Sequence, residues 1–461
     1  MPKLNFKKIR NIILQWEILL FRKYEIPTFL ILLLFISNMI IFVMFGYFIK
    51  ENINKSHNSK INKIIFEIID FPSDVKLVIK SLLNKEILYP NVLINNFNNL
   101  NYFYKDGKIQ DGAINDKGYL LLSSFSNQTK VCNVSLIRIS DQSVVHEWDN
   151  DFNMLKGHFN IDNIHRFRML HPLLFDNGDL LYSNTDNPLI MIDKYSSLKW
   201  IKKEQYHHSK ELDSDGNIWA CGIMNGKDSL SNFSKIFNFR DDALVKISSE
   251  GNIIFKKSIA TILYENDFLP TLAANFGTDP VHLNDIQPAL IDGEFWKKDD
   301  LLISLRNRNM VLLYRPKTNK IIWHKVGPWL NQHDVDFIST HEISIFGNDI
   351  ILYSENNNPD YDFISDHNNI YVYDFYNDST YTPYKDILLE SKVATPFEGL
   401  HNILPNNNVF IEETGNGRLL LLSNDSIIWE FTNRLDDDYL YVLNWSRYID
   451  EESIPKMFKK I

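Results

Sequence analysis

The 461-residue sequence contains little cysteine, glycine or proline. Its two cysteines, Cys132 and Cys221, stand far apart and form no CxxC pair, which excludes a thiolate zinc motif. They could pair in an oxidising compartment or stay as buried free thiols, and both alternatives are open. With 17 glycines and 16 prolines against 44% hydrophobic residues, collagen-like and disordered chains are excluded and a packed globular protein is favoured.

Positive charge is also in short supply. The 48 lysines and arginines are outnumbered by 58 aspartates and glutamates, which gives a formal net charge of -10. Binding to nucleic acid requires a basic face that neutralises phosphates, and the sequence shows no such cluster. A nucleic-acid partner is therefore not expected.

A long uncharged run stands near the N-terminus, at residues 28–49 (TFLILLLFISNMIIFVMFGYFI). It is long enough to cross a bilayer as one helix, and the KENINK that follows is not a small-residue cleavage site. Lysine and arginine are more frequent before the run than after it, which predicts a cytoplasmic segment over 1–27. We expect a single-pass membrane protein whose later residues lie in the periplasm or extracellular space. Residues 50–110 are expected to form a helical connector.

From residue 111 to 461, short apolar runs of strand length alternate with turn pairs such as NG, DG and GN. Aligned with one another, they form about six units of roughly fifty to seventy residues, the spacing of propeller blades. Several units end on a tryptophan expected to fill the contacts between blades: Trp148, Trp200, Trp323 and Trp429. The predicted fold is all-β, a six-bladed β-propeller preceded by one transmembrane helix and the short helical connector.

Equivalent positions of successive blades converge on the central channel, so residues distant in sequence can share one site. Five histidines stand near equivalent starts of the repeat: His171, His208, His282, His333 and His401. A single histidine at a strand start is usually structural, and we expect one or two of the five to be so. Arg306 lies in an apolar strand run between His282 and His333 and adds a cation to that region.

Four stretches together resemble those of a known family: HHSKELDSDGNI, DPVHLND, LLISLRNRNMVLLY and NQHDV. They are similar to the PAPS-independent arylsulfotransferase (arylsulfate sulfotransferase) family, over roughly residues 111–445. Members of that family are periplasmic six-bladed propellers that move a sulfuryl group from one phenol to another through a sulfohistidine. The resemblance implies an enzyme with an aryl sulfate donor and a phenolic or other hydroxyl acceptor, with no cofactor and no metal.

The resemblance also implies roles for individual residues. His333, in the QH motif, corresponds to the nucleophile. The residues that correspond to the sulfuryl-binding positions are His208, His282, Asn284 and Arg306, with His207 open as an alternative to His208. No role is implied for His171 or His401.

These residue types suit sulfuryl transfer. The transferring group spreads negative charge over its oxygens, which a guanidinium and imidazole N–H groups stabilise without a metal. A neutral imidazole can attack sulfur while its second nitrogen is held by a neighbour. Asp334 or Asp336 could orient His333 in this way, although we favour solvated loop carboxylates as the interpretation of both.

Two other classes of function fit parts of the pattern. A metal-dependent propeller oxygenase would use four histidines from different blades, such as His208, His282, His333 and His401, but Arg306 in the same site would repel the metal. A non-catalytic propeller would bind a polysaccharide or a protein partner at its mouth.

Overall fold

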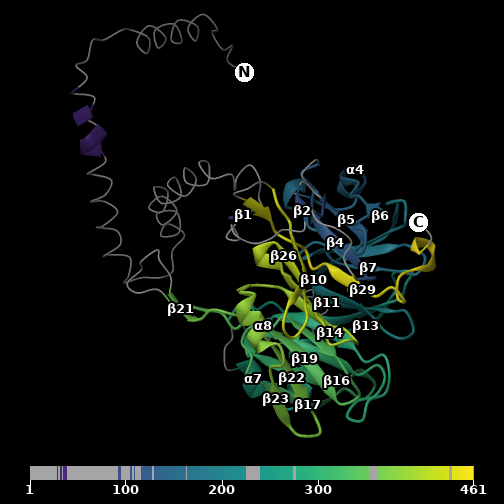
Figure 1. Ribbon diagram of the computed structural model, residues 1–461. Coiled ribbons are helices and arrows are strands. Elements are labelled where there is room, and N and C mark those ends of the chain that lie inside the picture. The colour runs from purple at the N-terminus through teal and green to yellow at the C-terminus, as the bar shows by residue number, and fades with distance from the viewer. Residues whose placement is uncertain are drawn as a thin grey trace, which may run out of the picture. The chain divides into compact units, whose positions relative to one another are not determined.

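The computed structural model describes most of the chain from residue 116 onward and short segments before it (Figure 1). The described ranges are 29, 32–33, 35–38, 92–94, 104–105, 108–109, 116–126, 129–161, 163–224, 239–273, 277–353, 362–435 and 439–459. The chain divides into two compact units, 1–84 and 85–461. The predicted cytoplasmic segment and most of the predicted membrane span lie outside the described residues. Within the described ranges, no helix is both long and apolar enough to span a bilayer.

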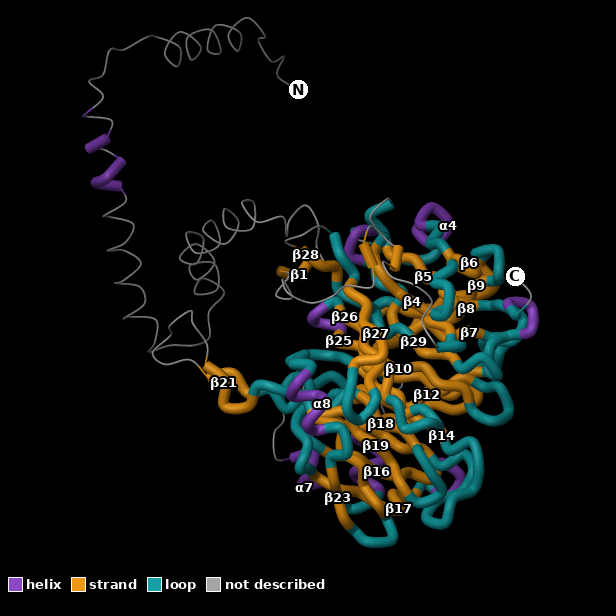
Figure 2. Tube along the Cα trace, viewed as in Figure 1, coloured by secondary structure: helices purple, strands orange, loops and turns teal. Residues whose placement is uncertain are grey.

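The described part of the larger unit is built from antiparallel sheets, four of which have four strands each (Figure 2). In spatial order these are β29 (Arg447–Ile449), β4 (Tyr119–Phe125), β5 (Cys132–Arg138) and β6 (Val144–Trp148); β14 (Leu283–Pro288), β15 (Leu301–Leu305), β16 (Met310–Arg315) and β17 (Lys320–Val326); β18 (Asp334–Phe337), β19 (Glu342–Gly347), β22 (Asn369–Asp374) and β23 (Ser379–Tyr381); and β24 (Leu400–Ile403), β25 (Val409–Glu413), β26 (Arg418–Leu422) and β27 (Ile427–Thr432).

A fifth sheet is continuous over seven strands. Its members are β7 (Leu170–Leu174), β8 (Leu180–Ser183), β9 (Asn187–Ile192), β10 (Leu198–Leu212), β11 (Ile218–Ile223), β12 (Asp242–Ile247) and β13 (Ile253–Ser258). The 15-residue β10 joins its two halves, because the strand pairs with β9 at its start and with β11 at its end. The all-β, propeller-like fold is thus confirmed, but the expected six separate blades differ from the sheets observed.

Shorter elements lie between and beside the sheets. The helices are α4 (Phe152–Lys156), α6 (Ile259–Glu265), α7 (Leu269–Ala273) and α8 (Lys385–Glu390), with 3-10 turns η1 (Ile164–Arg166), η2 (Arg306–Arg308), η3 (Pro316–Thr318), η4 (Thr414–Asn416) and η5 (Lys456–Phe458). Two-stranded pairs join β1 (Val92–Ile94) to β28 (Tyr439–Tyr441), β2 (Tyr104–Lys105) to β3 (Lys108–Ile109), and β20 (Ile351–Tyr353) to β21 (Asp362–Ser365). Within the expected helical connector, 50–110, the described residues 92–94, 104–105 and 108–109 form β1, β2 and β3, and the rest of the connector lies outside the described residues.

Hydrophobic side chains fill the spaces between sheets because strands such as β4 and β16 are buried on both faces. Trp148 and Trp429 are buried in two of the resulting clusters, and Trp200 and Trp323 pack against others. The predicted core role of these four tryptophans is confirmed. Both cysteines are buried free thiols, so the disulfide alternative is excluded.

The ring is closed by strands from opposite ends of the described chain. Arg447 and Ile449 of β29 pair with Leu121 and Tyr119 of β4, so the last strand becomes the innermost strand of the first sheet (Figure 1). The first strands of three sheets also contact one another, β14 with β18 and β18 with β24, and β10 of the seven-stranded sheet contacts β14. In a propeller-like fold such contacting strands lie toward the centre, where the histidines were expected to converge.

Candidate active site

A residue with left-handed backbone geometry occurs at or just before several of the innermost strands. The positive φ angles are 47° at His171, 46° at His208, 52° at His282, 48° at Asn331, 56° at Glu398 and 63° at Trp445. Such angles are uncommon for residues other than glycine, cost about 1–3 kcal/mol each, and concentrate at functional sites. The ladders of β7, β10 and β14 also shift register there. These local distortions re-aim the side chains that would otherwise alternate along a regular strand.

Three of the predicted histidines come together as a result. The ring centroid of His208 lies 5.0 Å from that of His282 and 6.0 Å from that of His333. The indole of Trp445 completes the group, 5.7 Å from His208 and 6.2 Å from His333. The four rings come from four different sheets, so the predicted convergence across the repeat is observed.

His333 is buried, and one of its two ring nitrogens is held by oxygen atoms. Its Nδ1 lies 2.5 Å from Oδ1 of Asn348 and 3.1 Å from the carbonyl oxygen of Asn331. Burial lowers the pKa of His333 from 6.5 to about 3; Asn348 acts against this shift, and the positive charge of Arg306 adds to it. The ring is therefore neutral at neutral pH, and the hydrogen bonds described for it are all made at Nδ1.

His207 and His208 have different surroundings. His207 is fully buried, with Nδ1 2.8 Å from Nδ1 of His208 and Nε2 3.4 Å from Oδ1 of Asp242. Burial alone would raise the pKa of Asp242, but His207 and Arg240 outweigh it and lower that pKa to about 2. Burial, followed by the charges of its histidine neighbours, holds the pKa of His208 well below its usual value. His208 is the histidine that reaches the site, and His207 lies behind it.

His282 immediately precedes β14 and Arg306 immediately follows β15, two neighbouring strands of one sheet. Nδ1 of His282 pairs with Oδ2 of Asp279, and the backbone N–H of Arg306 donates to the carbonyl of His282 over 3.0 Å. Arg306 was expected within a strand, but β15 ends at Leu305 and Arg306 begins η2, where the chain turns. In the described part of the chain its guanidinium has one side-chain hydrogen bond, 2.9 Å from Nη1 to Oδ1 of Asn307. Arg306 is thus half-buried, and most of the hydrogen-bond donors of its guanidinium are available to a ligand.

Asn284 lies deeper than the other predicted residues. It is fully buried, and its Nδ2 donates over 3.0 Å to the carbonyl oxygen of Gln332, the residue before His333. Its Oδ1 has no hydrogen-bond partner among the described residues. This placement supports the backbone that carries His333, and the predicted contact of Asn284 with the sulfuryl group stays a prediction.

Two residues of the site were missed by the sequence interpretation. Glu398 accepts a bidentate pair of hydrogen bonds from Arg168, at 2.9 and 2.7 Å, and a third from Nε1 of Trp445 at 3.2 Å. Burial alone would raise the pKa of Glu398, but Arg168 outweighs it and lowers that pKa. The carboxylate therefore stays ionised, and the positive charge of Arg168 balances its negative charge. The sequence repeat was aligned on its histidines. Before β24 and β29, the residue with left-handed backbone geometry is Glu398 and Trp445, respectively, so the alignment did not point to either.

Asp334, Asp336 and His401 form a separate cluster. Nδ1 of His401 lies 2.6 Å from Oδ2 of Asp334, and its Nε2 lies 2.7 Å from Oγ of Ser344. Burial raises the pKa of Asp334 to about 7 and that of Asp336 well above its usual range. Both earlier interpretations of these aspartates were wrong, because neither is a solvated loop carboxylate and Asp334 orients His401 rather than His333.

The cluster of Asp334, Asp336 and His401 also bears on the metal-dependent oxygenase, the alternative that would need four histidines in one site. Among the described residues, the potential metal ligands that lie close together, within 4.8 Å, belong to Asp334, Asp336 and His401. Both nitrogens of His401 are already hydrogen-bonded, which leaves a metal no imidazole lone pair without rearrangement. The four-histidine set proposed for an oxygenase is not assembled, because His401 points to Asp334 and Ser344.

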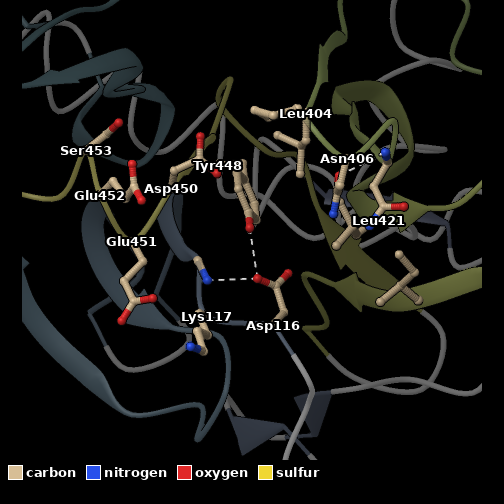
Figure 3. Close-up of a pocket in the computed structure, with 14 residues that line it drawn as sticks. Asp116, Lys117, Leu404, Asn406, Leu421, Tyr448, Asp450, Glu451, Glu452 and Ser453 are labelled. Carbon is tan, nitrogen blue, oxygen red and sulfur yellow. Dashed lines mark hydrogen bonds between the residues drawn. The ribbon is translucent and has the colours of Figure 1, made fainter.

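A pocket of about 500 Å³ lies elsewhere, at the seam between the first and last sheets (Figure 3). Tyr448 and the backbone N–H of Gly118 both donate to Oδ1 of Asp116, each over 2.8 Å. The rim also carries Asp450, Glu451 and Glu452, and none of the convergent histidines lines the pocket. Its negative charge makes it unsuitable for a sulfate ester, so the histidine site is the better candidate for anion chemistry.

A family model described as Arylsulfotransferase (ASST) matches residues 137–434. The chain belongs to the arylsulfotransferase family. The match includes His208, His282, Arg306 and His333, whereas Trp445 lies beyond it. No curated protein matches the chain.

Solved structures also resemble this arylsulfotransferase-family chain, at low similarity. A protein of unknown function from Bacteroides caccae has a TM-score of 0.43 and 12% identity, covering 72% of this chain and 99% of that one. A periplasmic gluconolactonase from Pseudomonas aeruginosa has a TM-score of 0.37 and 8% identity, with coverage of 72% and 99%. The WD40 domain of Pan2 from Neurospora crassa has a TM-score of 0.34 and 11% identity, with coverage of 67% and 78%. Similarities at this level carry no argument about function.

Proposed function

We propose that this protein transfers a sulfuryl group from an aryl sulfate to a phenolic or other hydroxyl acceptor, through a sulfohistidine on His333. The observation that carries the proposal is the surroundings of His333. Its ring is neutral, its Nδ1 is held by Asn348, and its ring centroid lies 6.0 Å from that of His208. Membership of the arylsulfotransferase family supports the same reaction class.

In the first half-reaction, the lone pair of His333 Nε2 forms a bond to sulfur. The bond between sulfur and the aryl oxygen breaks, and its electron pair leaves with the phenolate. In the second half-reaction the acceptor oxygen attacks the same sulfur and its proton passes to solvent, which balances the proton taken up by the released phenolate, while the nitrogen–sulfur bond breaks and its electron pair returns to neutral His333. Such a covalent route gives ping-pong kinetics.

The neighbours of His333 would stabilise the charge on the sulfuryl oxygens. Arg306 supplies a guanidinium whose side chain is lightly committed, and His208 and His282 supply imidazole groups from two other strands. Oδ2 of Asp279 pairs with Nδ1 of His282, which holds that ring in place.

We also propose the cellular arrangement and the blade count on the sequence evidence. The uncharged run 28–49 would anchor the protein, with residues 1–27 in the cytoplasm and the propeller in the periplasm or extracellular space.

The two halves of the seven-stranded sheet would act as two blades that share β10, which gives six blades in all with the four separate sheets.

The test is incubation of the purified protein with 4-nitrophenyl sulfate, alone and with a phenol, followed by nitrophenol release and intact-mass analysis. We expect a sulfuryl-sized adduct that maps to His333 and disappears when the phenol is added. His333→Gln should lose the adduct and the release, whereas His341→Gln, in the turn before β19, should keep both. Absence of adduct and release across several aryl sulfates would refute the proposal and favour a non-catalytic propeller.

A further inference from the structure

We propose that Asn348 is a positioning residue that fixes His333 as the tautomer protonated on Nδ1, so that Nε2 always presents its lone pair to the sulfuryl group. The catalytic meaning of this inference rests on the proposed function. The tautomer itself is a property of the resting protein and can be measured without turnover. Asn348 follows directly after β19 and lies outside the set of residues predicted from the sequence.

The atoms around Nδ1 of His333 determine where the proton lies. Both neighbours of this nitrogen are oxygens, Oδ1 of Asn348 at 2.5 Å and the carbonyl of Asn331 at 3.1 Å. A carbonyl or amide oxygen can only accept a hydrogen bond, so Nδ1 must be the donor. Because the ring is neutral, its other nitrogen then carries no proton.

The orientation of the Asn348 amide is fixed independently of His333. Its Nδ2 donates to the carbonyl oxygens of Thr395, at 2.9 Å, and Glu398, at 2.7 Å. A flipped amide would place Oδ1 against these two carbonyls and lose both hydrogen bonds. The side chain is fully buried, so water could not replace them. The segment that carries Glu398 therefore sets the amide, and the amide sets the imidazole.

The same hydrogen bond becomes stronger as the reaction proceeds. When Nε2 bonds to sulfur, the imidazole ring gains positive charge, and its Nδ1–H becomes a better donor to Oδ1 of Asn348. An interaction that strengthens on the way to the transition state accelerates the step rather than only tightening binding. A carboxylate at this position would instead favour protonation of the resting ring. The neutral amide thus orients His333 while leaving Nε2 free.

A structural comparison residue stands nearby. Asn368 is also fully buried, and its Nδ2 donates to the same carbonyl of Thr395, at 3.0 Å, and to that of Gly347, at 3.0 Å. It anchors the same segment but has no hydrogen bond to His333. Asn368→Leu therefore reproduces the loss of packing and segment anchoring without removing the acceptor on Nδ1.

The first measurement is nitrogen NMR of the full-length protein labelled with 15N-histidine, with the His333 signals assigned from His333→Gln. Wild type and Asn368→Leu should both show a protonated Nδ1 and an unprotonated Nε2. Asn348→Leu should lose this preference, and Asn348→Asp should keep it while raising the pH at which the ring takes a second proton. An unchanged His333 tautomer in Asn348→Leu would overturn the inference, as would an equal change in Asn368→Leu.

The second measurement is turnover of 4-nitrophenyl sulfate as a function of pH. Asn348→Leu should lower kcat by about 10²- to 10⁴-fold with little change in KM, the range seen when a catalytic histidine loses its tautomer partner. Asn348→Asp should recover part of kcat and move the acidic limb of the pH profile upward. If wild type shows the expected tautomer but no sulfuryl transfer, the proposed function fails alone. If transfer occurs and Asn348→Leu leaves both kcat and the tautomer unchanged, the inference on Asn348 fails alone.

Discussion

Two buried histidines beside the same strand have opposite surroundings. His333 immediately precedes β18 and its ring lies beside those of His208 and Trp445, whereas the next residue, Asp334, binds His401. Both histidines are almost fully buried, 3% and 2% exposed, and burial lowers the pKa of each. They differ in how many ring nitrogens have hydrogen bonds: one nitrogen in His333 and both in His401. Burial and pKa alone do not separate a reactive histidine from a structural one, but the hydrogen bonds do.

The carboxylates around the two histidines differ in the same way. Near His333 each one has a partner of its own: Glu398 pairs with Arg168, and Asp279 with His282. Near His401, by contrast, burial raises the pKa of Asp334 and Asp336, and repulsion between the carboxylates raises that of Asp336 further. The first region can therefore accept an anion, while the second can hold protons.

The largest expected effect is on activity, and it distinguishes Arg306, which lies in the site, from Arg447, whose ion pair stabilises the fold. Arg306→Met should lower sulfuryl transfer by about 10²- to 10³-fold, because it removes a donor to the charge that develops on the sulfuryl oxygens. Its stability should change little, since the guanidinium's hydrogen bond is to its neighbour Asn307. Steady-state kinetics with 4-nitrophenyl sulfate and urea unfolding measure the two quantities.

Arg447→Met is the matched comparison for Arg306. Arg447 pairs with Glu211 over 3.0 Å and donates to the carbonyls of Pro172 and Lys210. Its loss should lower the free energy of unfolding by about 3 kcal/mol. Equal losses of stability in the two variants, with equal losses of activity, would remove the distinction between the two regions.

A smaller effect is expected from removing the structural histidine. His401→Leu removes the imidazole partner of Oγ of Ser344 and of Oδ2 of Asp334, although Oδ2 keeps the backbone N–H of residue 401, and should lower the free energy of unfolding by about 2–3 kcal/mol. Turnover per folded molecule should stay within a few-fold of wild type. Circular dichroism during urea unfolding gives the first value and active-site titration the second. Loss of turnover without loss of stability would instead place His401 in the chemistry.

The smallest effect is on how stability depends on pH. His333 has a pKa of about 3 in the folded protein against 6.5 unfolded, so between these values the unfolded chain binds more protons and stability falls as the pH falls. Asp334 has a pKa of about 7 against 3.8, so the folded protein binds more protons in that window and stability falls as the pH rises. Between pH 4 and 6.5, His333→Gln should flatten the rise of stability with pH, and Asp334→Asn should steepen it. Urea unfolding at a series of pH values measures both slopes, and slopes that change in the same direction would contradict this assignment.

The sequence was sufficient for the fold class and for the convergence of three histidines, because both follow from a repeat whose period is visible. It placed Arg306 one residue too far inside a strand, since the turn that begins there depends on a left-handed Asn309 rather than on hydrophobic pattern. Glu398 and Trp445 were missed because they share a backbone geometry with the histidines but not a side-chain type. Asn348 was missed for a different reason. Its role depends on which way its amide faces, and carbonyls about fifty residues away decide that.

The closing strand has a consequence for the synthesis of the protein. Trp445 stands just before β29, the strand that seals the ring against β4, so one wall of the site is among the last parts of the propeller to leave the ribosome. A chain truncated before this point would contain His208, His282 and His333 but would lack both the indole beside them and the strand that closes the circle. We therefore expect the proposed sulfuryl transfer to require β29, so that a chain truncated before Trp445 would be inert rather than partly active.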